Sequence, residues 1–245
     1  TLKEMRRFEE AEASFKKAVR SKPDYAEAHN NLGVTLQELG KLEGAEVSFK
    51  KAITLKPDYA EAYNNLGNTL KEMRRFEEAE ASFKKALRLK PDYPEAYSNL
   101  GNTLREQGRL GEAEESFKKA IMLKPDLAEA YSNLGNTLKE MNRLDEAESS
   151  FKQSITLQPN YAEAHYNLGI TLQELDRLDE AESSFKKAIT LQPNYPSAKH
   201  MLASLTGETS TTAPQDYVEE LFDNYAAKFD NSLIKNLGYM LSWPV

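Results

Sequence analysis

A period of 34 residues runs through most of this chain and constrains its fold more than any other feature. The triplet Asn-Leu-Gly returns at this spacing, and prolines and phenylalanines keep the same period. The triplets begin at Asn31, Asn65, Asn99, Asn133 and Asn167, the prolines are Pro23, Pro57, Pro91, Pro125, Pro159 and Pro193, and the phenylalanines are Phe15, Phe49, Phe83, Phe117, Phe151 and Phe185. A strict period of roughly 20–50 residues is typical of solenoids, whose units bury their apolar faces against one another.

Residues 60–93 show what one unit contains. Four apolar or small residues from Tyr63 onward lie at i, i+3, i+4 and i+7, which predicts an amphipathic first helix. After a break at Arg74-Arg75, a second apolar stripe centred on Phe83 predicts another helix. Pro91 ends it, because proline lacks an amide donor and clashes with the preceding turn. Gly67 is small enough to let the two helices approach closely.

These residues resemble the tetratricopeptide repeat (TPR), which has an aromatic residue at position 4, Leu at 7, Gly at 8, Leu at 11, Ala at 20, Phe at 24, Ala at 27 and Pro at 32. Complete repeats are 26–59, 60–93, 94–127, 128–161 and 162–195, after a half repeat at 1–25 and before a degenerate capping helix at 196–206. The resemblance implies an all-α fold, a right-handed α-solenoid whose first helices line the concave face. We expect extra helices at the C-terminal end.

Composition excludes several kinds of chemistry. The 245 residues include no cysteine, so a disulfide framework, a cysteine-ligated zinc site and a thiol nucleophile are excluded. A net charge of −7 disfavours general binding of nucleic acid, which needs a basic excess. No apolar run approaches the roughly 20 residues of a membrane span. We expect no cofactor, no metal site and a cytoplasmic location.

Positions that the fold does not require are the candidates for binding, and on the first helix these are 2, 5, 6, 9, 12 and 13. Position 6 is asparagine in every complete repeat, although asparagine is a mediocre helix former. The predicted groove residues are Asn31, Asn65, Asn99, Asn133 and Asn167 at position 6, Asn68, Asn102 and Asn136 at position 9, and Lys71, Arg105 and Lys139 at position 12. This pattern resembles the asparagine ladder of O-GlcNAc transferases, which implies binding of an extended peptide. The alternative is that each position-6 asparagine bonds the adjacent repeat and fixes the stacking.

Charge refines the expected partner. Positions 2 and 13 are glutamate in all five complete repeats, so we expect a basic or neutral peptide rather than an acidic one. Position 5 lacks the lysine of the TPR carboxylate clamp, which disfavours the C-termini of chaperones as partners. Glu and Lys at positions 21 and 25 predict i,i+4 pairs on the convex face, interpreted as solvated. His29 and His165 at position 4 are expected to be packing residues.

The last forty or so residues break the period. Residues 207–213 are small and polar and predict a linker, and residues 214–245 predict a helical segment with an aromatic stripe. The stretch from Tyr217 to Tyr239 resembles the lead-in of class I S-adenosylmethionine-dependent methyltransferase domains in bacterial TPR–methyltransferase proteins. That resemblance implies a parent enzyme, but this chain lacks the glycine-rich cofactor loop and is not expected to be an enzyme. The alternatives are a cap on the solenoid or a helix that docks in a neighbouring molecule.

Three functions follow from these patterns. The first is a non-catalytic scaffold that binds an extended peptide or partner helix in the groove, and the second is substrate recruitment for a downstream methyltransferase. The third is head-to-tail self-association into oligomers or filaments, since residues 1–25 lack a first helix. The predicted end-to-end contacts are Phe8, Phe15, Tyr217, Leu221, Phe222, Tyr225 and Phe229. Because the chain begins at Thr1 without an initiator methionine, we expect a fragment. The partner, the oligomeric state, the number of repeats before Thr1 and the sequence after Val245 stay open.

Overall fold

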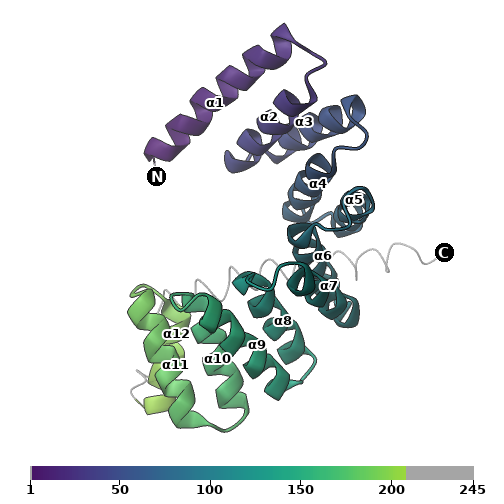
Figure 1. The fold of residues 1–245 in the computed structure, drawn as a ribbon. Helices are drawn as coiled ribbons and strands as arrows, with labels where there is room; N and C mark the ends of the chain where they lie inside the picture. Colours follow the sequence, from purple (N-terminus) through teal and green to yellow (C-terminus); the bar gives the residue numbers. More distant parts are fainter. Residues whose placement is uncertain (1, 208–245) are drawn as a thin grey trace, which may run out of the picture. The chain divides into compact units, whose positions relative to one another are not determined.

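The computed structural model describes residues 2–207, which form twelve α-helices and no strand. They fall into two compact units, one up to Arg143 with α1–α8 and one from Leu144 with α9–α12. In the first unit the helices are α1 (Leu2–Ser21), α2 (Ala26–Glu38), α3 (Leu42–Leu55), α4 (Ala60–Glu72), α5 (Phe76–Leu89), α6 (Pro94–Glu106), α7 (Leu110–Leu123) and α8 (Ala128–Glu140) (Figure 1). In the second they are α9 (Leu144–Leu157), α10 (Ala162–Glu174), α11 (Leu178–Leu191) and α12 (Pro196–Thr206).

The helices pack in the order that a repeat solenoid requires. The first and second helices of a repeat form the most extensive contacts, as in α2 with α3 and α4 with α5 (Figure 1). Each second helix also contacts the first helix of the following repeat, as α3 contacts α4 and α11 contacts α12. The all-α solenoid class predicted from the period is therefore confirmed within each unit.

The core of a hairpin is built on position 24 and position 8, as predicted. Phe83 is fully buried, and so are its equivalents in the other complete repeats. A Cβ placed on Gly67 would lie 2.6 Å from the Phe83 ring, closer than van der Waals contact permits. Glycine at position 8 is therefore a requirement of helix-to-helix packing.

The turn between the two helices of a repeat uses a left-handed residue at position 15. Glycine has a positive φ there at Gly40 and Gly108, but the same conformation is adopted by Arg74 at φ 58°. Asn142 and Asp176 take it in the remaining repeats. The turn is closed by the Arg75 amide, which donates to the Leu70 carbonyl at 2.8 Å.

Helix α1 departs from this pattern although its sequence does not. Residues 2–18 are identical to residues 70–86, yet α1 runs unbroken from Leu2 to Ser21 where the later copy turns at Arg74. Among the described residues, α1 contacts α2, but no earlier helix packs against its start as α4 packs against α5. The strong helix formers of α1 then continue the helix.

The glutamates at position 21 connect neighbouring repeats, and their interpretation as solvated pairs is wrong. Glu80 does lie 2.6 Å from Lys84, but its side chain is only 12% exposed. Its second oxygen accepts a hydrogen bond from Arg109 of the next repeat at 2.6 Å, and Arg109 also binds Glu112. The same bridge recurs at Glu12–Lys41, Glu46–Arg75, Glu114–Arg143 and Glu148–Arg177. The period of 34 places a cation at position 16 beside this carboxylate each time.

Candidate peptide-binding surface

Four first helices lie side by side in the first unit, with α2 contacting α4, α4 contacting α6 and α6 contacting α8. Positions 3, 5, 7, 8, 10 and 11 are buried in all four helices. The residues at positions 2, 6, 9, 12 and 13 are at least partly exposed, and together they form what we call the first-helix surface. Position 5 was expected to face the ligand, and this expectation is wrong, because Asn30, Asn64, Ser98 and Ser132 are at most 6% exposed.

The asparagines at positions 5 and 6 bond one repeat to the next. The Asn65 amide donates to the Asn30 side-chain oxygen at 3.2 Å, and the Asn99 amide donates to that of Asn64 at 3.0 Å. These bonds match the alternative interpretation, in which position 6 fixes the stacking of repeats. Serine replaces asparagine at position 5 in the next two repeats, at Ser98 and Ser132.

Position 9 carries a second row of asparagines with a different environment. Asn68, Asn102 and Asn136 are half-buried on α4, α6 and α8. Among residues 2–207, none of these three side chains has a hydrogen-bond partner. The flanking repeats carry the aliphatic residues Val34 and Ile170 at this position. The polar row is therefore confined to three successive repeats.

Position 12 adds charge beside this row. Burial lowers the pKa of Lys71. The positive charge of nearby Arg105 also lowers this pKa, whereas neighbouring glutamates raise it. Within the described part of the chain, no carboxylate lies within ion-pair distance of Lys71. Arg105 reaches Glu140 of the next repeat at 3.9 Å, and its side chain is 20% exposed. Lys139 is also half-buried.

Several glutamates on either side of this surface have side-chain partners. At position 2, Glu27 lies 3.3 Å from Lys56 and Glu95 lies 3.3 Å from Lys124. At position 13, Glu72 accepts a hydrogen bond from Gln37 of the preceding repeat.

In the second unit the corresponding helix is less open. Asn167 is only 8% exposed on α10. Tyr166 takes position 5, and its ring centroid lies 5.0 Å from that of Tyr195 and 5.9 Å from that of Phe185. The side-chain oxygen of Gln173, at position 12, is buried without a hydrogen-bond partner. This unit therefore lacks the asparagine and cation row of α4, α6 and α8.

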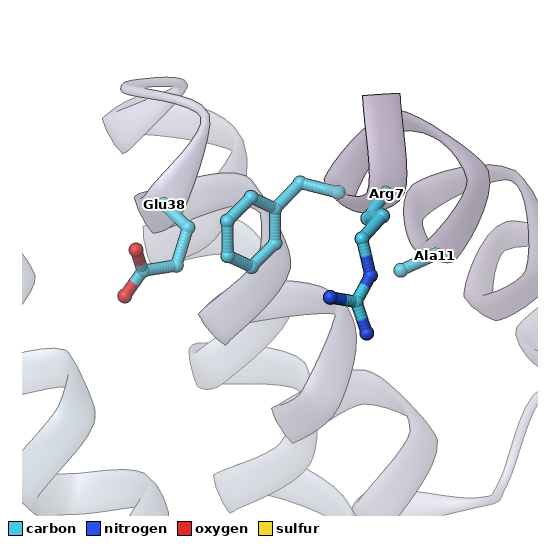
Figure 2. Close-up of a pocket in the computed structure, with 4 residues that line it drawn as sticks. Arg7, Ala11 and Glu38 are labelled. Atoms are coloured by element: carbon cyan, nitrogen blue, oxygen red, sulfur yellow. The ribbon is translucent and has the colours of Figure 1, made fainter. Parts of the chain in front are cut away.

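A hollow of about 680 Å³ lies between α1 and the end of α2, lined by Arg7, Phe8, Ala11 and Glu38. Figure 2 shows Arg7 and Ala11 on one side of it and Glu38 on the other. Phe8 and Phe15 are half-buried, whereas Phe49 is fully buried in its complete hairpin. The other predicted end contacts, Tyr217, Leu221, Phe222, Tyr225 and Phe229, lie outside the described residues, as do the linker and the methyltransferase-like segment.

Two further observations concern metals and membranes. No group of three or more histidine or carboxylate side chains gathers into a metal-binding cluster within residues 2–207. None of the described helices combines the length and the apolar character needed to cross a membrane. His29 and His165 each place Nε2 within hydrogen-bond distance of a backbone carbonyl, that of Pro23 at 3.0 Å and that of Pro159 at 3.1 Å.

Solved structures with the same architecture include several TPR proteins. YrrB, described as a TPR protein with an unusual peptide-binding site, is 29% identical with a TM-score of 0.60, over 76% of this chain and 96% of YrrB. TTC0263, a thermophilic TPR protein of Thermus thermophilus, is 25% identical with a TM-score of 0.61, over 74% and 98%. The pilF protein of Pseudomonas aeruginosa is 21% identical with a TM-score of 0.69, over 86% and 96%, and shows the fold alone.

Family models agree with this architecture. The tetratricopeptide repeat model matches residues 162–195, and the model described as the cilia and flagella-associated protein 70 C-terminal domain matches residues 2–166. No curated protein matches the chain. The match to residues 2–166 covers more than half of the sequence. The chain therefore belongs to the family of the cilia and flagella-associated protein 70 C-terminal domain, a tetratricopeptide-repeat family.

Proposed function

We propose that the first-helix surface of α2, α4, α6 and α8 binds an extended peptide of a protein partner. TPR proteins are in general scaffolds for protein–protein interaction, and that broad function comes with the family. The narrower proposal is carried by one observation: Asn68, Asn102 and Asn136 are half-buried on successive helices without a hydrogen-bond partner among the described residues. A carboxamide offers a donor and an acceptor, as a peptide backbone does.

Geometry supports an extended ligand. Packed helices lie roughly 8–10 Å apart, and an extended chain advances about 3.3 Å per residue. Successive position-9 asparagines would therefore contact about every third residue of a peptide that crosses the helices. YrrB, a structural relative, is described as having an unusual peptide-binding site, which supports a peptide as the class of ligand.

Charge supports a basic or neutral peptide. In the first unit, positions 2 and 13 supply Glu27, Glu61, Glu95, Glu129, Glu38, Glu72, Glu106 and Glu140, against the cations Lys71, Arg105 and Lys139. The excess of carboxylates disfavours an acidic peptide, by like-charge repulsion.

The test uses fluorescein-labelled twelve-residue peptides in three series, rich in lysine, neutral and rich in glutamate, with binding followed by fluorescence anisotropy. We expect the lysine-rich and neutral series to bind and the glutamate-rich series to bind at least tenfold more weakly. A variant with Asn68, Asn102 and Asn136 all replaced by alanine should lose roughly tenfold or more in affinity, at about 1 kcal/mol per lost hydrogen bond.

The matched control is Asn65→Ala, which removes a bond between repeats. It should lower the unfolding midpoint and leave the affinity of the folded protein within about twofold. Equal affinity of the triple variant and the wild type would overturn the proposal, and a preference for the glutamate-rich series would overturn the predicted charge.

We propose head-to-tail association as a second function, on the observation that no cation of a following repeat lies beside Glu182 among the described residues. Glu182 pairs with Lys186 alone among the described residues, and its side chain is 34% exposed. Glu148, one repeat earlier, is 11% exposed because it also binds Arg177. Arg7 on α1 is at position 16 of the half repeat, and Arg177 is at position 16 of the repeat 162–195. A second copy whose α1 covers α12 would complete a hairpin and place Arg7 at Glu182.

Light scattering after size exclusion tests this association across concentration. The expected mass rises above 27.7 kDa with concentration. Arg7→Glu and Glu182→Arg should each give monomers, and the double variant should associate again, because the charge pair is restored. A monomer at every concentration, or a double variant that stays monomeric while the wild type associates, would contradict the proposal.

A further inference from the structure

A second hollow lies in the unit from Leu144 onward. It is an open hollow with a volume of about 510 Å³. It lies among the second helix of one repeat, α9, and both helices of the next, α10 and α11. The lining residues are Lys152, Ile155, Thr156, His165, Leu168, Ser183, Ser184 and Lys187.

Histidine replaces tyrosine at position 4 of this repeat, and His165 lines the hollow. Three of the five complete repeats carry tyrosine there. In the repeat 60–93, Lys85 lies over the Tyr63 ring, 5.9 Å from its centroid. Lys187 is the counterpart of Lys85, but it faces the smaller ring of His165. The larger phenol ring of tyrosine is therefore missing beside this lysine.

The hollow brings polar groups without partners to one place. Ser183 and Lys187 lie one turn apart on α11 and share a face. Both residues are exposed, and within residues 2–207 neither side chain has a hydrogen-bond or ion-pair partner. The other hydroxyls are occupied, since Ser184 donates to the Glu180 carbonyl and Thr156 donates to the Lys152 carbonyl.

His165 contributes an acceptor. Its Nε2 lies 3.1 Å from the Pro159 carbonyl, which can only accept, so Nε2 carries the proton. Burial lowers the pKa of His165, and Lys187 also lowers it while the bond to Pro159 raises it, so the neutral form of the ring is favoured. Nδ1 of the neutral ring is then a hydrogen-bond acceptor. The floor beneath it is apolar, with Leu168 buried and Ile155 half-buried.

We propose that this hollow binds the carboxyl terminus of a peptide that ends in an aliphatic residue. The Lys187 ammonium and the Ser183 hydroxyl would donate to the terminal carboxylate. The last side chain would pack on Ile155 and Leu168, and its backbone amide would donate to His165 Nδ1. This binding site is distinct from the first-helix surface and does not depend on the function proposed for it.

The test follows the imidazole nitrogens of His165 by NMR in the full chain labelled with ¹⁵N. The probes are N-acetyl-leucine, which has the carboxylate, the amide and the aliphatic side chain, N-acetyl-leucinamide, which lacks the carboxylate, and inorganic phosphate. N-acetyl-leucine should shift the His165 Nδ1 signal with a midpoint of roughly millimolar concentration. The signal of His29 is an internal control. In its repeat, the residue equivalent to Ser183 is Val47, which has no hydroxyl to bind a carboxylate.

Variants separate a site from general anion binding. Lys187→Gln should weaken N-acetyl-leucine binding about tenfold, as loss of a charge-assisted hydrogen bond predicts. His165→Tyr restores the residue of the sister repeats, should leave the fold intact by circular dichroism, and should abolish the shift of backbone amide signals from Ser183 to Lys187. Lys85→Gln, at the matched position, should change nothing.

Three results would overturn the proposal. They are the absence of a His165 shift at high concentrations of N-acetyl-leucine, an equal response to the leucinamide, and binding of phosphate as tight as that of the carboxylate. The last would identify a general oxyanion site without recognition of a peptide terminus.

Discussion

At the scale of single residues, arginine adopts two different backbone conformations at two places with identical flanking sequence. Arg74 holds a left-handed φ of 58°, and its Nε is buried without a partner, whereas Arg6 lies inside α1. A left-handed residue other than glycine costs roughly 1–2 kcal/mol. Glycine within a helix costs about 1 kcal/mol relative to a good helix former.

Arg74→Gly should therefore stabilise the protein by about 1 kcal/mol, even though the contact of Arg74 with the Phe76 ring is lost. Arg6→Gly should destabilise α1 by a similar amount. Urea unfolding followed by circular dichroism measures the first, and amide hydrogen exchange in residues 8–18 measures the second. The same sign for both substitutions would show that the two copies do not differ in backbone conformation.

Glycine at position 8 gives a second prediction at this scale. Gly67→Ala would press a methyl group into the Phe83 ring at 2.6 Å and should destabilise the protein by about 1–3 kcal/mol. Gly111→Ala is the matched control, since nothing lies within 4 Å of the added carbon on α7 and alanine favours a helix. It should be neutral or stabilising by up to about 1 kcal/mol in the same unfolding experiment. A destabilising effect of Gly111→Ala as large as that of Gly67→Ala would contradict the account of position 8.

At the scale of elements, the sequence predicts the helices of complete repeats but not the extent of α1. The apolar spacing around Phe83 and the proline at position 32 predict where second helices lie, and the structure confirms them. The break at Arg74 cannot be read from local sequence, because residues 2–18 contain the same residues and form one helix. Packing against a first helix decides the turn. The bridges between repeats were missed for the same reason, although the coincidence of Glu at position 21 with a cation at position 16 of the next repeat was a signal.

These bridges predict a response to acid. Hydrogen bonds from Arg75 and then from Lys50 lower the pKa of Glu46 below its ordinary value of 4.5. A lowered pKa in the folded state means that the stabilisation is complete above the unfolded value and is lost as pH falls through the folded value. The unfolding midpoint should thus fall between roughly pH 5 and pH 3.

The comparison for this prediction is a variant with Glu46, Glu80 and Glu114 all replaced by glutamine. It should be less stable than the wild type at pH 7, and its stability should vary less between roughly pH 5 and pH 3. Thermal unfolding at a series of pH values measures both. Parallel pH curves for the two proteins would show that the bridges do not contribute to folding.

At the scale of the whole molecule, the repeat pattern predicts the family but not the ligand. Recognition of a ligand depends on the residues that lie between the recurring packing positions of the repeat. The sequence predicts that asparagines recur on the first helices, but their roles depend on partners one repeat away. Asn65 and Asn99 bond the preceding repeat, while Asn68 and Asn102 have no partner among the described residues. Only packing separates these two rows, because both lie on the exposed side of the helix. The hollow at His165 likewise depends on packing, because Ser183 and Lys187 lie on α11 and the His165 ring lies on α10.

In the proposed binding mode, the position-9 asparagines contact the peptide, whereas the position-6 asparagines hold the repeats together. The most direct measurement is the NMR signal of each asparagine side-chain amide during titration with a lysine-rich twelve-residue peptide. We expect the amide signals of Asn68, Asn102 and Asn136 to shift to saturation and those of Asn65 and Asn99 to stay within line width. A response of Asn65 and Asn99 without any response of the position-9 row would contradict this binding mode.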